Sequence, residues 1–314
     1  MNDLIKAYLK AYVWPLPKFK REVVVMVDGV HSHGGLTDRF RHILSIYSYC
    51  KQKKIPFYIY YVYPCDLSLI LEPNQYDWRI DCSELTYTRY DSKEICLWVE
   101  DPDESLQTKK KINQQHVSML DKEIGSGKRV QYHIYGNSYF SEGHYRELFV
   151  ELFKPSQYLQ ERIDGVREQL PDSYEAVTLR FQQLLGDFTE GSFTVLPESE
   201  RENLIQCCIK KIDSLYSNRY FSTSKLLVTS DSPTFLERVR ELPYVRTIPG
   251  KMEHMDFTKN RDLEMNAKAF VDLFLLSQAQ RLTLIQAGGM YKSGFPKFAA
   301  ELGGKHYNEL LYHL

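Results

Sequence analysis

The chain has 314 residues, enough for two domains of ordinary size, and 43% of them are hydrophobic, which excludes an intrinsically disordered protein. Its 40 lysines and arginines against 41 aspartates and glutamates leave a formal net charge of −1, which argues against a nucleic-acid backbone as the main partner. The six cysteines form no C-x-x-C pair and have no histidine at metal-ligand spacing, so we expect core thiols in a reducing cytoplasm and no zinc site.

The segment 1–21 has an amphipathic pattern. Its apolar side chains fall on one helical face, with lysines beside them: Leu4, Ile5, Tyr8, Leu9, Tyr12 and Val13. Such a helix either packs on its own domain or lies in a membrane interface. No apolar run approaches the roughly 20 residues that span a bilayer. We therefore expect a cytoplasmic protein. If the helix lies in a membrane interface, the protein also makes peripheral contact with the inner face of the membrane.

A buried strand followed by a glycine turn is the most informative local feature. The β-branched run in 21–29 is typical of a buried parallel strand, and His33-Gly34-Gly35 precedes a helix that we expect over 40–53. Loops at the carboxyl ends of parallel strands are common ligand sites, because helix N-termini point free N–H groups there. The pattern favours a ligand site near Gly34, and a tight turn without a ligand is the alternative.

Alternating strands and helices continue along both halves, which predicts two parallel sheets in an α/β protein. In the first half we expect strands at 56–63, 95–99 and 130–135 and helices at 109–123 and 142–154. Lys154-Pro155-Ser156 marks a boundary between domains 1–155 and 156–314, and Ser156 can cap the next helix. In the second half we expect helices at 157–170, 199–217, 234–241 and 266–280 and strands at 176–180, 225–229, 244–248 and 282–285.

Polar residues at predicted strand ends form four candidate groups. The first adds Asp38 and Arg39 to the glycine turn. The second is Arg180, whose planar guanidinium suits a phosphate, unless it is a structural partner of Asp187. The third is the segment 229–232, for which capping of the following helix is the alternative.

The fourth group is the segment 291–296, which lies between a predicted strand and a predicted helix. Small residues before a helix N-terminus can bind an anion, and Phe295 could stack on a flat ring. A simple turn is the alternative interpretation of this segment.

Read together, these segments resemble the fucosyltransferase superfamily, which includes protein O-fucosyltransferases, bacterial nodulation fucosyltransferases and α-1,2- and α-1,6-fucosyltransferases. The resemblance runs from about Val23 to Tyr307 and rests on the motifs HGGLTDRFRHILSIY, LEPNQYDW, VTLRFQQLLGDF, LLVTSDS and AGGMYKSGFPKFAAELGGKHY. It implies the glycosyltransferase B fold, in which two Rossmann-like domains face each other across a cleft. The N-terminal domain would bind the acceptor and the C-terminal domain the nucleotide sugar.

The resemblance also implies roles for individual residues. Arg180 would contact the β-phosphate of GDP and stabilise the charge that develops as the glycosidic bond breaks. Nucleotide-sugar contacts would come from Ser230 and Asp231, from Ser293, Gly294 and Phe295, and from Gly34, Gly35, Asp38 and Arg39 of the glycine turn. The sequence departs from the family pattern at Thr178, where the family has histidine, and at Pro296, where it has a hydroxyl residue.

His33 occupies the position where some relatives have a catalytic carboxylate before the glycine. An imidazole of ordinary pKa could deprotonate an acceptor hydroxyl, and a histidine that only packs or binds the acceptor is the alternative.

The implied function is transfer of fucose from GDP-fucose to a carbohydrate acceptor in bacterial-type surface glycan synthesis, with no metal or other cofactor. Another nucleotide sugar on the same fold, or a non-catalytic glycan- or nucleotide-binding relative, remains open. Asp101-Pro102-Asp103 imitates the metal-binding D-x-D of the other large glycosyltransferase fold, although Pro102 favours a simple turn.

Overall fold

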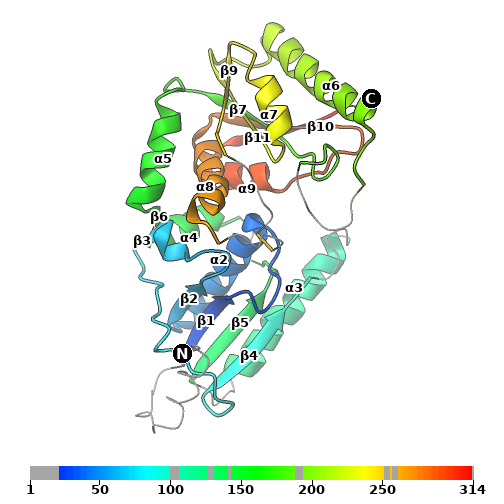
Figure 1. The fold of residues 1–314 in the computed structure, drawn as a ribbon. Helices are drawn as coiled ribbons and strands as arrows, with labels where there is room; N and C mark the ends of the chain where they lie inside the picture. The colour runs from blue at the N-terminus through cyan, green and yellow to red at the C-terminus, as the bar shows by residue number, and fades with distance from the viewer. Residues whose placement is uncertain are drawn as a thin grey trace. The chain divides into compact units, whose positions relative to one another are not determined.

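The computed structural model describes residues 21–99, 106–125, 130–140, 143–187, 194–250, 255–256 and 261–312. The chain divides into two compact units, Met1–Lys154 and Pro155–Leu314, each with its own parallel sheet (Figure 1). Within the described ranges no helix combines the length and apolar character needed to cross a bilayer. The amphipathic segment 1–20 and the segment Asp101-Pro102-Asp103 lie outside the described residues.

The sheet of unit 1 has four parallel strands in the order β2-β1-β5-β4. Their bounds are β1 Glu22–Val27, β2 Phe57–Tyr61, β4 Ser92–Leu97 and β5 Gln131–Gly136. Residues Val23 to Met26 are completely buried, which is why β1 has no polar side. The order places β1 and β5 in the centre, so the loops that follow these two strands lie side by side.

The helices of unit 1 are α2 Leu36–Lys53, η1 Leu67–Leu69, α3 Leu106–Leu120 with its π-helical extension η2 Asp121–Gly125, and α4 Tyr145–Leu152. The prediction that a helix runs to residue 154 was wrong. After Leu152 the chain forms the short strand β6 Phe153–Pro155, which pairs with β3 Leu71–Pro73. The residue before a proline disfavours helical geometry, so the helix ends before Pro155.

Unit 2 has five parallel strands in the order β11-β10-β7-β8-β9. Their bounds are β7 Glu175–Leu179, β8 Leu226–Ser230, β9 Val245–Thr247, β10 Arg281–Ala287 and β11 His306–Tyr312. The chain builds the sheet outward from β7 in one direction and then returns to build it in the other. The order therefore reverses between β7 and β10, and in folds of this kind ligands bind in a crevice outside the carboxyl ends of the two strands at such a point. We call this edge of unit 2 the crevice.

The helices of unit 2 are α5 Gln157–Arg167, α6 Glu198–Ser217, α7 Pro233–Val239, α8 Leu263–Gln278 and α9 Phe295–Gly303. Alternate buried residues of β7, β8 and β10 pack with α6 and α7 in one hydrophobic core. The helix α8 contacts both α5 and α9 (Figure 1). The predicted cap is confirmed, since the Ser156 hydroxyl accepts the Leu159 N–H at 3.3 Å.

The expectation that the cysteines are core thiols holds for three of them. Cys50, Cys65 and Cys208 are buried, whereas Cys82 and Cys207 are exposed and Cys96 is half-buried. The expectation was wrong for the last three.

Candidate functional site

The crevice of unit 2 brings three predicted groups to one edge of the sheet. Arg180 directly follows β7, Ser230 ends β8, and the segment 288–294 connects β10 to α9. The Tyr291 N–H donates to the Arg180 carbonyl oxygen at 3.2 Å, so the loops after β7 and β10 are joined directly. The site is therefore assembled from segments that are far apart in sequence.

Asp231 holds the loop that carries Arg180. Its two carboxylate oxygens accept the backbone N–H groups of Phe181 at 2.9 Å and Gln182 at 2.8 Å, and its Oδ2 lies 3.4 Å from Arg180 Nε. Gln182 has a φ of 51°, a strained value that these hydrogen bonds help to maintain. Burial raises the pKa of the Asp231 carboxyl, whereas the Arg180 guanidinium and the two N–H donors lower it.

The sequence predicts that Ser230 and Asp231 contact the nucleotide. In the structure the two residues are 3% and 2% exposed. The Ser230 hydroxyl accepts the N–H of Ser232 at 3.1 Å. Their side-chain oxygens therefore accept backbone N–H groups of the loops at this edge and hold those loops in place.

The alternative partner of Arg180 has another role. Asp187 Oδ2 accepts the Ser232 hydroxyl at 2.7 Å and the Thr234 N–H at 3.0 Å, at the start of α7. The Ser232 hydroxyl in turn accepts the Phe235 N–H at 3.1 Å, which confirms the capping interpretation for this residue. The carboxylate that pairs with Arg180 is that of Asp231, and the Arg180 side chain stays 18% exposed.

The N-terminus of α9 lies at the end of the loop that is bonded to Arg180. Gly294 is the N-cap and is exposed, Phe295 is half-buried, and the buried Ser293 hydroxyl accepts the Phe295 N–H at 3.2 Å. The Phe295 N–H is thus already bonded and Pro296 has no N–H, so this N-terminus offers mainly the positive end of the helix dipole. Together with the fixed charge of Arg180, it can bind a phosphate or diphosphate.

Thr178, which stands where the family has histidine, is buried on the strand before Arg180. Its hydroxyl lies 2.8 Å from the hydroxyl of Thr229 on β8. This pair satisfies two polar groups inside the sheet, so the departure from the family pattern leaves no unpaired buried hydroxyl here.

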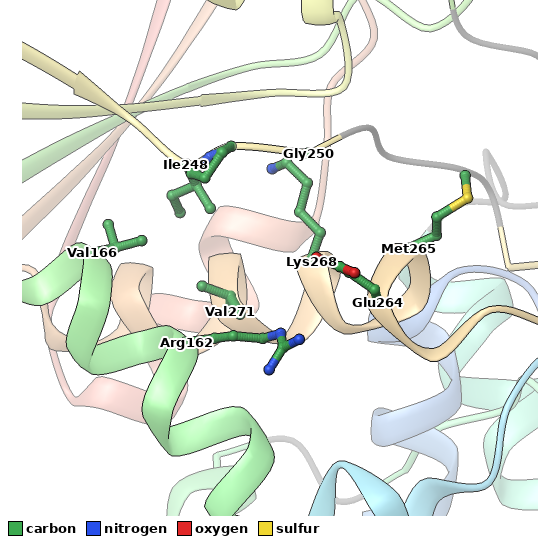
Figure 2. A pocket seen from close by; sticks show the side chains of 9 residues that line it. Arg162, Val166, Ile248, Gly250, Glu264, Met265, Lys268 and Val271 are labelled. Carbon is green, nitrogen blue, oxygen red and sulfur yellow. The ribbon is translucent and has the colours of Figure 1, made fainter.

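A pocket of about 330 Å³ opens between α5, α8 and the segment that follows β9 (Figure 2). It lies at the same edge of the sheet, because Ile248 comes directly after β9. The lining is half apolar, with one acidic and two basic side chains: Arg162, Val166, Ile248, Pro249, Gly250, Glu264, Met265, Lys268 and Val271.

Sequence reasoning missed the buried ion pair beside this pocket. Lys268 Nζ donates to both oxygens of Asp272 at 2.9 Å, and the side chains are 4% and 0% exposed. Burial raises the pKa of the Asp272 carboxyl, and the Lys268 ammonium lowers it. The signal was present, because two opposite charges at i and i+4 stand out in an otherwise apolar helix.

In unit 1 the predicted glycine turn is braced by its own polar residues. Asp38 Oδ2 accepts the Gly35 N–H at 3.2 Å and completes the cap of α2. Arg39 is 1% exposed and donates to the Gly34 carbonyl at 3.2 Å and to the Tyr61 hydroxyl at 2.9 Å. Asp38 and Arg39, which were predicted to bind the nucleotide sugar, therefore form part of the turn.

His33 lies in the loop that follows β1, beside the end of β5. Its Nδ1 is 3.1 Å from the carbonyl oxygen of Gly136, the last residue of β5, so Nδ1 carries a proton and Nε2 is the basic atom of the neutral ring. The ring packs near Trp98 and Tyr135 and is only 1% exposed. A role as base requires the acceptor to reach a buried Nε2.

No protein-family model and no curated protein matches the sequence. Solved structures of fucosyltransferases do match the fold. A NodZ α-1,6-fucosyltransferase soaked with GDP-fucose is 14% identical, with 90% of this chain and 93% of that chain covered and a TM-score of 0.57. The chain shares the fold of this enzyme, an α/β arrangement of two units with parallel sheets, as the resemblance implies.

Two further solved structures have the same fold. A mutant of FUT1 from Arabidopsis thaliana in complex with GDP is 14% identical, with 100% of this chain and 75% of that chain covered and a TM-score of 0.58. POFUT1 in complex with GDP-fucose is 10% identical, with 95% and 98% covered and a TM-score of 0.51. At such identities the likeness concerns the fold alone.

Proposed function

We propose that the protein is a glycosyltransferase that transfers fucose from GDP-fucose to a carbohydrate acceptor. The observation that carries this proposal is the crevice of unit 2. There Asp231 holds the loop that carries Arg180. The Arg180 carbonyl oxygen accepts the Tyr291 N–H, which joins this loop to the segment before α9. The fold likeness to fucosyltransferases with bound GDP or GDP-fucose supports the same substrate class.

In this proposal Arg180 and the positive end of the α9 helix dipole bind the diphosphate of the donor. As the glycosidic bond breaks, negative charge builds up on the departing diphosphate, and fixed donors stabilise it without rearranging. The pocket beside Lys268 lies at the same edge and supplies a surface for another part of the donor (Figure 2). Unit 1 would then bind the acceptor, with His33 as the candidate base.

We infer that the transfer needs no metal ion, because a guanidinium and a helix N-terminus already provide positive charge for the diphosphate. Activity measured in excess EDTA should equal activity with added Mg²⁺ or Mn²⁺. Loss of activity in EDTA that Mn²⁺ restores would refute this inference and would favour a role for Asp101 and Asp103.

The acceptor and the location follow the sequence prediction. We propose a glycan acceptor in bacterial-type surface polysaccharide synthesis, with the enzyme in the cytoplasm and segment 1–21 in contact with the inner face of the membrane. The amphipathic pattern of this segment supports the membrane contact.

The test compares Arg180→Ala with Arg240→Ala, an exposed arginine after α7 that serves as a matched control. Losing a charged donor to the transition state costs about 2 to 4 kcal/mol, so Arg180→Ala should lower turnover roughly a hundredfold or more. Arg180→Lys should recover little, because lysine keeps the charge but lacks the planar fork. Normal turnover in a folded Arg180→Ala variant would refute the assignment.

The donor is identified by thermal-shift measurements with GDP, UDP, ADP, CMP and their sugars, since a ligand of the folded state raises the melting temperature. A larger shift with UDP or its sugars than with GDP would favour another nucleotide sugar. Binding of GDP-fucose without transfer or hydrolysis would favour a non-catalytic relative.

A further inference from the structure

A group of three potential metal ligands lies in unit 1, apart from the residues used above. Among the described residues, His31, Glu94 and Cys96 bring an imidazole nitrogen, a carboxylate oxygen and a sulfur within 4.8 Å of one another. His31 lies in the loop after β1, whereas Glu94 and Cys96 belong to β4. No sequence pattern indicates this group, because the histidine is 63 residues away from the glutamate.

The distances suit a small cation. His31 Nε2 lies 3.1 Å from Glu94 Oε1, and Cys96 Sγ lies 3.2 Å from the same oxygen. Zinc bonds of about 2.0 to 2.3 Å in a tetrahedron place neighbouring ligand atoms roughly 3.3 to 3.8 Å apart. Two of the three spacings are thus close to those of a tetrahedral zinc site, and all three atoms lie within 4.8 Å of one another.

The backbone already positions the three side chains. Glu94 and Cys96 are two residues apart on one strand, so they point to the same face of the sheet. The strand is fixed by its parallel pairing with β5. The His31 ring packs edge-on against Tyr135, with ring centroids 4.6 Å apart.

The group is also accessible to an ion from solution. The side chains of His31 and Glu94 are 33% and 53% exposed. Three protein ligands leave a fourth tetrahedral position for water or another small ligand.

We propose that His31, Glu94 and Cys96 form a binding site for a zinc-class divalent cation in unit 1. The donor set selects the ion: a thiolate and an imidazole favour Zn²⁺ or Co²⁺, whereas Mg²⁺ and Mn²⁺ prefer oxygen ligands. On binding, the Cys96 thiol loses its proton to the buffer and its sulfur takes a metal bond. The ion would tie the loop after β1 to the edge strand β4, and no step of the sugar transfer involves it.

Cobalt titration of the metal-free wild-type protein tests the proposal. We expect one Co²⁺ per chain, with a thiolate-to-metal charge-transfer band and the intense visible bands of a tetrahedral site. Cys96→Ser should abolish the charge-transfer band, and Glu94→Gln and His31→Gln should each weaken Co²⁺ binding more than about tenfold. Cys207→Ser, which removes an exposed thiol of unit 2, is the matched control and should bind Co²⁺ like the wild type.

A second measurement uses the unmodified protein and does not depend on the folding of a variant. Zn²⁺ should slow the alkylation of Cys96 by iodoacetamide, followed by mass spectrometry, and leave the alkylation of Cys207 unchanged. A charge-transfer band that persists in Cys96→Ser, equal protection of both cysteines, or equal thermal stabilisation by Mg²⁺ and Zn²⁺ would overturn the proposal. Because none of these readouts uses sugar transfer, its failure is distinct from failure of the proposed function.

Discussion

Asp231→Asn is the substitution that most directly tests how the crevice is built. The carboxylate of Asp231 accepts two backbone N–H groups and pairs with Arg180. An amide keeps one acceptor oxygen, but its NH₂ group faces an N–H donor. One buried N–H then loses its partner, at a cost of about 1 to 3 kcal/mol, and the charge pair is lost as well.

We therefore expect unit 2 to lose about 2 to 4 kcal/mol of stability, which combines the unsatisfied N–H with the loss of the ion pair, reduced for the 18% exposure of Arg180. Because the same loop carries Arg180, turnover at saturating donor should fall roughly tenfold to a hundredfold, at 1.4 kcal/mol per factor of ten.

The assay measures kcat and KM for the donor together with the melting temperature, and it uses Asp187→Asn as the matched control. Asp187 accepts two hydrogen bonds at the start of α7, so its substitution should lower the free energy of unfolding by about 1 kcal/mol and leave kcat unchanged. An Asp231→Asn protein that loses stability but keeps wild-type kcat and KM would refute the reasoning.

Further predictions concern unit 1, α5 and the first residues of the chain. Gly34 has a φ of +78° and an added Cβ would lie 2.8 Å from a carboxylate oxygen, so Gly34→Ala should cost about 1 to 2 kcal/mol or more in denaturant unfolding. An added Cβ at Gly165 on α5 would lie in open space, so Gly165→Ala should instead raise the free energy of unfolding by about 0.5 to 1 kcal/mol. Burial lowers the pKa of His42 from 6.5 to about 3. Between pH 3 and pH 6.5, His42 therefore binds a proton in the unfolded chain but not in the folded chain. Stability should fall as the pH drops below about 6.5, and the melting temperature of His42→Asn should depend less on pH. If His33 is the base, His33→Ala should lower kcat and remove the acidic limb of the rate profile; if it only positions the acceptor, saturating acceptor should restore the rate. Deleting residues 1–18 should abolish salt-sensitive binding to anionic vesicles and spare catalysis in solution, whereas unfolding of the truncated protein would assign the segment to the core.

The main strands could be predicted because their sequences are continuously apolar. The run at Val23–Val27 is buried on both faces, and such a run leaves no choice but a central strand. The strand β11 was missed because it lies at an edge and exposes about every second side chain, with polar residues along it. The short strands β3 and β6 pair residues far apart in sequence, and neither has a recognisable pattern of its own.

The candidate site could be located from the sequence, but the direction of its side chains could not. Glycines and hydroxyl residues after apolar runs indicated which strand ends meet in the crevice. Whether Asp231 faces a ligand or the backbone depends on the path of the chain after Arg180, which no local pattern encodes. The same holds for Arg39, which the resemblance assigned to the nucleotide sugar and which donates to the carbonyl oxygens of Gly34 and Tyr63 and to the Tyr61 hydroxyl.

The hydrogen bond from Tyr291 to Arg180 has a consequence for how this crevice can change during evolution. Both of its atoms belong to the backbone, so every residue type except proline preserves the donor at position 291. The Tyr291 side chain is 44% exposed, so a substitution there changes the chemistry of the surface while the backbone hydrogen bond is kept. Substitutions at position 291 can therefore change what this surface recognises while the hydrogen bond to the Arg180 carbonyl oxygen is kept.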